Sequence, residues 1–221
     1  MTSAIVFDFD GVLADSEPLH LRAYQEVLSS LGVTLTREDY YAKYLGYNDE
    51  DMLRKLTEAQ GWKMDERRLK ALIAEKCRVF DKVIDATDVL YPGAAACIER
   101  MAAAFPVGIA SGALRHEIEA VLRRAGLAEH FKFIVASGDT PHSKPAPDPY
   151  RRAAELHGLP PAACLAIEDS RWGIESAQSA GLSCIAVAHT YPPEELTMAD
   201  RVVRSLDEIS PEVVRALLAG P

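Results

Sequence analysis

Short apolar runs separated by segments of helical period dominate most of the chain. The first run covers residues 4–9 and breaks into Asp10-Gly11. A run of this length without polar alternation is typical of a strand buried on both faces of a parallel sheet. Similar runs occupy residues 107–110, 133–136, 163–167 and 184–188, with segments of helical period such as 114–125 and 150–157 between them. This alternation predicts an α/β fold with a doubly wound, Rossmann-like parallel sheet.

One stretch, from about residue 16 to residue 89, departs from this rhythm. It follows a helical period throughout, with glycines as punctuation and no convincing strand. One helix face there carries Leu69, Leu72, Ile73, Lys76 and Phe80. Their spacing of three and four residues would bury this face against other helices. We therefore predict a helical-bundle cap at 16–89, inserted into a core formed by 1–15 and 90–221, and the two chain crossings favour a hinge.

Composition narrows the classes of function. The 221 residues are 48% hydrophobic, which excludes a disordered protein and allows a substantial buried core. The formal net charge of −9 would repel a phosphate backbone, so nucleic acid is not an expected partner. The same charge would repel a phosphorylated metabolite, and a phosphate site would therefore need local cations or a metal.

The four cysteines are widely spaced, form no C-x-x-C pair and lie among apolar neighbours. This pattern indicates buried free thiols rather than a zinc or redox site. The first residues do not resemble a signal peptide, and no apolar run approaches the ~18 residues of a membrane span. We expect a soluble monomer or weak dimer with no membrane partner, in a reducing compartment, by default the cytoplasm.

Two acids, Asp8 and Asp10, follow the first predicted strand. Side chains two residues apart share a face, so both are expected in the crevice beyond the carboxyl end of the strand, where α/β proteins bind ligands. Close like charges need a cation or a shared proton, and Mg²⁺ prefers oxygen ligands. A calcium loop is excluded because Gly11 is the fourth residue counted from Asp8, not the sixth. Two solvated acids at a strand end remain the alternative.

Two further segments are candidates for holding phosphate. At Ser111-Gly112, after a second apolar run, a hydroxyl and backbone N–H groups suit phosphate oxygens, although a turn or a helix cap is the commoner reason for such a pair. Lys144 precedes Pro145 and Pro147, which stiffen the backbone and limit where its ammonium can point. An ordinary solvated lysine is the alternative there.

A second pair of acids, Glu168 and Asp169, ends another apolar run. Ser170 can cap a helix that begins near Trp172, so acids at a helix start explain the pair without a metal. That explanation does not account for the presence of acid pairs after two strands of one sheet. Metal ligation by both pairs is therefore the favoured interpretation.

Taken in order, four segments resemble the four motifs of the haloacid dehalogenase superfamily. They are D-F-D-G-V at 8–12, the strand ending at Ser111, S-K-P-A-P-D at 143–148 and I-E-D-S at 167–170. The insert resembles the small helical cap of subfamily I, and D-S-E-P-L-H at 15–20 resembles the phosphatase and β-phosphoglucomutase-like branch. The resemblance spans almost the whole chain.

The resemblance implies a phosphoric monoester hydrolase that acts on a small phosphorylated metabolite with Mg²⁺ as cofactor. Asp8 would be the nucleophile that forms an aspartyl-phosphate, and Asp10 the general acid and then base. Ser111 and Lys144 would clamp the phosphate. True dehalogenases of the superfamily generally lack the second acid of the first motif, so Asp10 favours phosphate chemistry.

The resemblance also implies the metal ligands and candidate substrate contacts. Mg²⁺ would contact Asp8, the main-chain oxygen of Asp10, and Asp169, with Glu168 assisting. The candidate substrate contacts are His20, Gly46, Lys76, Gly112 and Arg115.

A β-phosphoglucomutase-like phosphomutase is the first alternative function. That group resembles G-x-x-R in its cap, whereas Asp49 stands at the position of the arginine here, and Leu114 stands where a lysine is expected. The loss of two cations favours the phosphatase, unless Lys76, Arg78 or Arg115 compensates. A phosphate-binding protein without turnover is a further alternative, which Asp10 disfavours because a silent site has no need of it.

Overall fold

The computed structural model describes residues 3–44, 47, 49–84 and 87–219. The chain divides into two compact units, one formed by Met1–Asp15 with Val89–Pro221 and the other by Ser16–Asp88. We call them the sheet unit and the helical unit. The boundaries expected from the sequence, 15/16 and 89/90, differ from this division by one residue at the second crossing.

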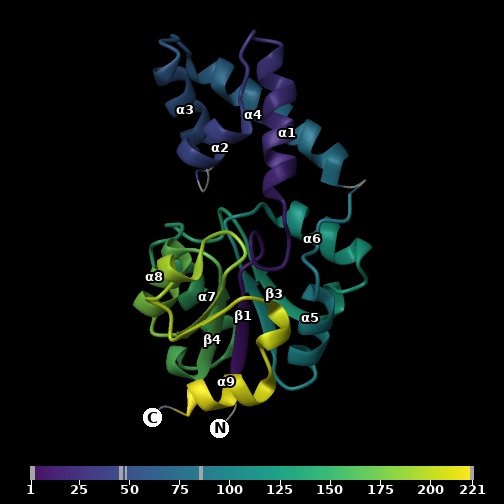
Figure 1. The fold of residues 1–221 in the computed structure, drawn as a ribbon, viewed down its shortest axis with the longest axis vertical. Helices are drawn as coiled ribbons and strands as arrows, with labels where there is room; N and C mark the ends of the chain where they lie inside the picture. The colour runs from purple at the N-terminus through teal and green to yellow at the C-terminus, as the bar shows by residue number, and fades with distance from the viewer. Residues whose placement is uncertain (1–2, 45–46, 48, 85–86, 220–221) are drawn as a thin grey trace. The chain divides into compact units, whose positions relative to one another are not determined.

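A parallel sheet forms the centre of the sheet unit (Figure 1). In the part of the chain that the structure describes it has six strands, in the order β3-β2-β1-β4-β5-β6, and every neighbouring pair is parallel. The strands are β1 (Ala4–Phe7), β2 (Val107–Ala110), β3 (Phe131–Val135), β4 (Cys164–Glu168), β5 (Ser183–Val187) and β6 (Arg201–Val203). The predicted doubly wound α/β fold is confirmed, with β6 as an additional edge strand.

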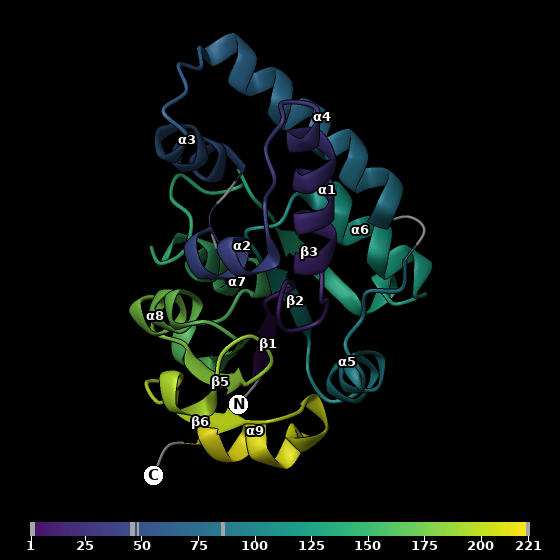
Figure 2. The same ribbon diagram turned by 45° about the horizontal axis from the view of Figure 1, so that its top comes forward.

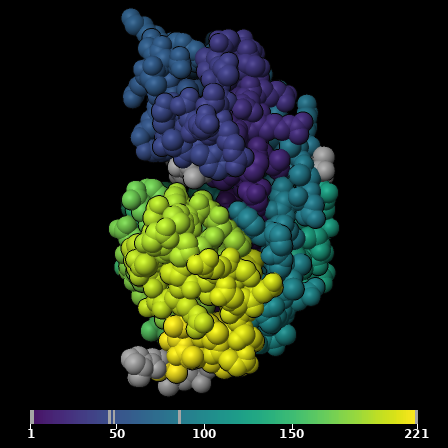
Figure 3. All heavy atoms as spheres, viewed as in Figure 1, coloured from purple at the N-terminus to yellow at the C-terminus, as the bar shows by residue number. Residues whose placement is uncertain are grey.

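Helices cover both faces of this sheet. They are α5 (Ala94–Ala102), α6 (Arg115–Arg124), α7 (Asp148–His157), α8 (Arg171–Ala180) and α9 (Pro211–Leu218). Helices α7 and α8 lie on one face, and α5 and α6 lie on the other (Figures 1 and 2). Helix α9, yellow in Figure 3, forms part of the surface of the unit.

Alternation along β1 explains how the sheet is buried on both sides. Ala4 and Val6 belong to the apolar core beneath α7 and α8, so the intervening Ile5 and Phe7 point to the opposite face. All four side chains are fully buried. Because neither face of the strand meets water, the sequence reads as an unbroken apolar run.

The helical unit contains α1 (Glu17–Ser29), α2 (Arg37–Lys43), α3 (Asp49–Ala59) and α4 (Glu66–Ile84). Helices α1 and α4 pack along each other and share an apolar core with α2 and α3. On the predicted face of α4, Leu69, Leu72 and Phe80 are buried. Lys76 is buried with them, although lysine normally stays exposed unless it is paired.

All four cysteines are free; three are buried, and Cys77 is half-buried. Among the described residues, no helix combines the length and the apolar character that a membrane crossing requires.

Candidate active site

Three carboxylates gather where β1 and β4 end side by side. Asp8 directly follows β1, and its backbone N–H donates to the carbonyl of Ile167 in β4 at 2.9 Å. Oxygens of Asp8, Glu168 and Asp169 all lie within 4.8 Å of one another, and all three residues are buried. The strand order reverses between β1 and β4, the point at which open α/β sheets bind their ligands.

One ammonium group reaches this cluster. Lys144 Nζ lies 3.0 Å from Asp8 Oδ1 and 2.6 Å from Glu168 Oε1. The hydroxyl of Tyr150, a fully buried residue of α7, donates to the same Glu168 oxygen at 2.7 Å. The structure therefore brings Asp8, Lys144, Glu168 and Asp169 together from three separate segments, as the sequence motifs require.

The charges of the cluster are out of balance. Burial raises the pKa of Asp8 to about 6, an effect that Lys144 opposes and Glu168 reinforces. Burial also raises the pKa of Asp169, and the neighbouring Glu168 and Asp8 add to the rise. Burial alone would lower the pKa of Lys144, but Asp8 and Glu168 hold it above its ordinary value. Oxygen donors with a deficit of positive charge fit a hard divalent cation such as Mg²⁺.

Two glycines make room for these carboxylates. A Cβ atom on Gly11, whose φ is +78°, would lie 1.9 Å from Asp169 Oδ2. A Cβ atom on Gly173, in the first turn of α8, would lie 1.9 Å from the carboxyl carbon of Glu168. Each acid therefore occupies the space that a side chain at the facing glycine would fill.

The remaining predicted residues of the sheet unit lie at its strand ends and in α6. Ser111 follows β2 and is buried, and its Oγ accepts from the backbone N–H of Ala113 at 3.2 Å. Gly112 is exposed, and a Cβ atom there would meet nothing within 4 Å. Asp10 is half-buried, and its backbone forms an isolated bridge with Ala14. Arg115 donates to Asp139 Oδ2 at 2.6 Å.

The loop after β5 carries residues that sequence analysis missed. Thr190 lies beside Asp169: an ideal Cβ on Gly11 would be 2.7 Å from Thr190 Oγ1 and 1.9 Å from Asp169 Oδ2. His189 Nδ1 lies 3.1 Å from the carbonyl oxygen of Gly11, and its ring stacks on Tyr91 with centroids 4.1 Å apart. Their position after an apolar run was the available signal, because the ends of parallel strands converge at one edge of the sheet.

A family model described as haloacid dehalogenase-like hydrolase matches residues 2–181. The chain belongs to the haloacid dehalogenase-like hydrolases. The predictions of this family and of a hydrolytic enzyme are thereby confirmed.

Known members of the family resemble this hydrolase over nearly its full length. It is 31% identical to Protein CbbY of Rhodobacter capsulatus, in an alignment that covers 97% of this chain and 98% of that protein. It is also 31% identical to hexitol phosphatase B of Escherichia coli K12, with 94% of each chain covered. The crystal structure of CbbY from Rhodobacter sphaeroides in complex with phosphate superimposes with a TM-score of 0.84 at 30% identity, and covers 94% of this chain and 96% of that one.

The helical unit of this hydrolase encloses a polar cluster of its own. Lys76 Nζ lies 2.8 Å from Asp49 Oδ1 and 2.8 Å from His20 Nδ1, and the His20 ring stacks on Phe80 with centroids 4.1 Å apart. Burial lowers the pKa of His20 to about 3, and the positive charge of Lys76 adds to this effect. The His20 ring is therefore neutral, and its Nδ1 accepts a hydrogen bond from the Lys76 ammonium. The ammonium of Lys76 therefore already has two partners, Asp49 and His20. Gly46 lies outside the described residues.

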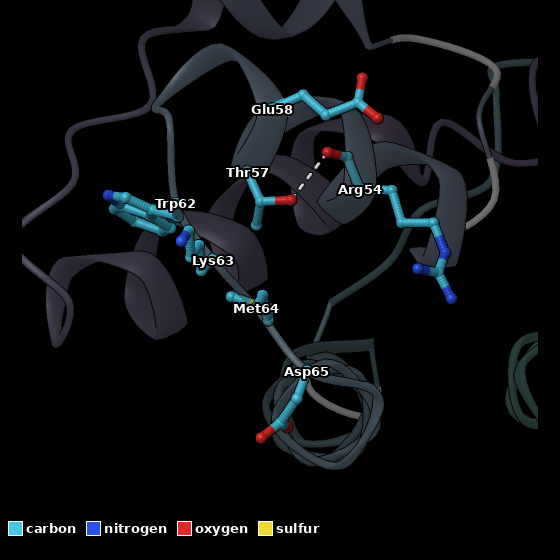
Figure 4. A pocket seen from close by; sticks show the side chains of 7 residues that line it. All are labelled: Arg54, Thr57, Glu58, Trp62, Lys63, Met64 and Asp65. Atoms are coloured by element: carbon cyan, nitrogen blue, oxygen red, sulfur yellow. Dashed lines mark hydrogen bonds between the residues drawn. The ribbon is translucent and has the colours of Figure 1, made fainter.

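A pocket of about 650 Å³ also lies in the helical unit, at the end of α3 and the segment that follows it (Figure 4). Its lining residues are Arg54, Thr57, Glu58, Trp62, Lys63, Met64 and Asp65. The Thr57 hydroxyl donates to the Arg54 carbonyl, and Arg54 is paired with Glu50 and Glu66. These polar groups make contacts within α3 and to α4. We assign the pocket no function.

Proposed function

We propose that this hydrolase is a Mg²⁺-dependent phosphatase that cleaves small phosphorylated metabolites, sugar or short-acid phosphates, through an aspartyl-phosphate on Asp8. The observation that carries the proposal is the 3.0 Å contact between Lys144 Nζ and Asp8 Oδ1, next to Glu168 and Asp169. A carboxylate held beside a fixed ammonium is suited to attack phosphorus, because the same ammonium meets the charge of the phosphate oxygens.

In this proposal Asp8, Asp169 and the main-chain oxygen of Asp10 hold the Mg²⁺ ion, with Glu168 assisting. When bound, the ion supplies positive charge to the phosphate oxygens. The raised pKa values of Asp8 and Asp169 support such a site, since a cation nearby would favour the ionised carboxylates. Glu168 also fixes Lys144, through its 2.6 Å contact with the ammonium.

The chemical steps use residues at the ends of β1 and β2 and Lys144, from the loop before α7. A carboxylate oxygen of Asp8 forms a bond to phosphorus while the ester bond to the leaving alcohol breaks, and Asp10 donates a proton to that alcohol. Asp10 then takes a proton from water, which attacks phosphorus and releases Asp8. Lys144 and Ser111 hold the phosphate oxygens through both steps.

Two relatives support a phosphorylated sugar as substrate: one is named a hexitol phosphatase, and a CbbY mutant from Rhodobacter sphaeroides has a crystal structure in complex with xylulose-(1,5)bisphosphate. We propose that His20, Gly46 and Lys76 of the helical unit contact the substrate, with Gly112 and Arg115 of the sheet unit. Lys76 and Arg115 already pair with Asp49 and Asp139, which weakens the case for a second phosphate site and hence for a phosphomutase.

Phosphate release from a panel of sugar and short-acid phosphates, with and without Mg²⁺, tests this function. We expect Mg²⁺-dependent release that Asp8→Asn abolishes. The matched control is Asp39→Asn, which removes an exposed carboxylate paired with Lys43 and should leave release unchanged. Equal release by wild type and Asp8→Asn would contradict the proposal. Isomerisation of a sugar phosphate without net release would indicate the phosphomutase, and neither reaction would indicate a silent binding protein.

A further inference from the structure

The loop after β5 reaches the acidic cluster from a strand that the proposed mechanism does not use. Thr190, in this loop, is half-buried, and its Oγ1 lies beside the Asp169 carboxylate. The ideal Cβ position of Gly11 lies 1.9 Å from Asp169 Oδ2 and 2.7 Å from Thr190 Oγ1. The carboxylate and the hydroxyl therefore lie together over Gly11, in space that is free because residue 11 has no side chain.

Several contacts fix the backbone of this loop. The N–H of Ala188 donates to the Val203 carbonyl of β6 at 2.9 Å. His189 Nδ1 lies 3.1 Å from the Gly11 carbonyl oxygen, and the ring packs flat against Tyr91. Thr190 follows directly, so its hydroxyl is presented from a backbone that is held by the two preceding residues.

Asp169 needs such support because its neighbours repel it. The carboxylates of Asp8 and Glu168 lie within 4.8 Å, and the side chain of Asp169 would lower this repulsion by rotating away from them. A hydroxyl donor holds one carboxylate oxygen and leaves lone pairs of the other available to a cation.

We propose that Thr190 is a positioning residue whose hydroxyl donates to the carboxylate of Asp169 and so fixes it in the orientation needed to ligate a divalent cation. The proposal rests on the proposed function, since it presumes that Asp169 is a metal ligand. Groups that orient a metal ligand in this way typically contribute about 10- to 100-fold to metal affinity. A threonine with a purely structural role would affect stability and leave that affinity unchanged.

The test measures Mn²⁺ binding to the full chain by the loss of the electron paramagnetic resonance signal of free Mn²⁺. Thr190→Val keeps the shape of the side chain and removes the hydroxyl, and we expect the Kd for Mn²⁺ to rise about 10- to 100-fold. Thr190→Ser retains the donor and should bind close to wild type. Thr57→Val, which removes a hydroxyl bonded to the Arg54 carbonyl in the helical unit, is the matched control and should not change the Kd.

Phosphate release supplies the second readout. For Thr190→Val the Mg²⁺ concentration at half-maximal rate should rise by the same factor, with most of kcat recovered at saturating Mg²⁺. If Thr190→Val does not fold, as judged by circular dichroism, Thr190→Ala replaces it as the variant without a hydroxyl.

Two results would overturn the inference: an unchanged Kd in the variants without a hydroxyl, or equal weakening in Thr190→Val and Thr190→Ser. Failure of the wild type to bind Mn²⁺ at millimolar concentrations would instead remove the proposed metal site, and this inference with it. The two failures are therefore distinguishable in one titration.

Discussion

Substitution of Gly11 by alanine probes the packing of the acidic cluster most sharply. Residue 11 adopts a φ of +78°, which costs a residue with a Cβ atom about 1–2 kcal/mol. Its Cβ would also lie 1.9 Å from Asp169 Oδ2, whereas ordinary contacts of a Cβ begin at 3.4 Å. The carboxylate of Asp169 must therefore retreat by about 1.5 Å, the difference between these two distances.

A retreat of this size should disable the site. Misplacement of a catalytic group by ~1 Å can cost about 10²-fold in rate, and disturbance of a metal ligand about 10- to 100-fold in affinity. We expect Gly11→Ala to lower kcat/KM for phosphate release by ~10²-fold or more and to weaken Mn²⁺ binding by at least ~10-fold.

The matched control is Gly138→Ala. Gly138 has a similar φ of +86°, but a Cβ there would meet nothing within 4 Å. Both variants should lose about 1–2 kcal/mol of stability through the backbone conformation, a loss that urea unfolding would measure. Only Gly11→Ala also has the clash with Asp169. If the two variants bind Mn²⁺ and release phosphate equally well, the close packing of Gly11 against Asp169 is not what positions the carboxylate.

Three further predictions concern stability. Burial lowers the pKa of His20 to about 3, so between pH 6.5 and pH 5 only the unfolded chain takes up a proton at this residue. The free energy of unfolding of the wild type should therefore fall by about 2 kcal/mol over this range. Urea unfolding of His20→Gln should not show this loss. Tyr150→Phe removes the donor to Glu168 Oε1 and should lower the free energy of unfolding by about 1.5–3 kcal/mol; a change below ~0.5 kcal/mol would refute the role of this bond. Mg²⁺ at 100 times its Kd should stabilise the folded chain by about 2.7 kcal/mol and raise Tm by several degrees, and an unchanged Tm would argue against the metal site.

The sequence predicts the central strands of this fold better than its edge. Residues 4–9 form an unbroken apolar run because β1 is buried on both faces between β2 and β4. At the edge, β6 (Arg201–Val203) is three residues long and starts with an exposed arginine, so its pattern does not differ from that of a loop. The edge strand β3 begins at Phe131, two residues before the predicted run. The apolar pattern misses its start because Phe131 is only partly buried and Lys132 is exposed.

The site could be predicted as far as its residues fall in recognisable segments. Asp8 and Asp169 follow strands, Lys144 lies in a loop that two prolines stiffen, and the sheet topology brings the three together. The contribution of Gly173 could not be foreseen, because a glycine inside a helix gives no sign that a carboxylate packs against it. The burial of Lys76 had a local signal, its place on the apolar face of α4, but its partner Asp49 lies in another helix.

The aspartyl-phosphate on Asp8 is the centre of this account, and a rapid-quench experiment tests it most directly. Enzyme and Mg²⁺ are mixed with a ³²P-labelled phosphate ester that the wild type hydrolyses, and the reaction is stopped with acid before the first turnover ends. We expect label bound to the protein, released by hydroxylamine as an acyl phosphate would be, and absent in Asp8→Asn. Release of phosphate without labelled protein at any time, or equal labelling of Asp8→Asn, would contradict the account.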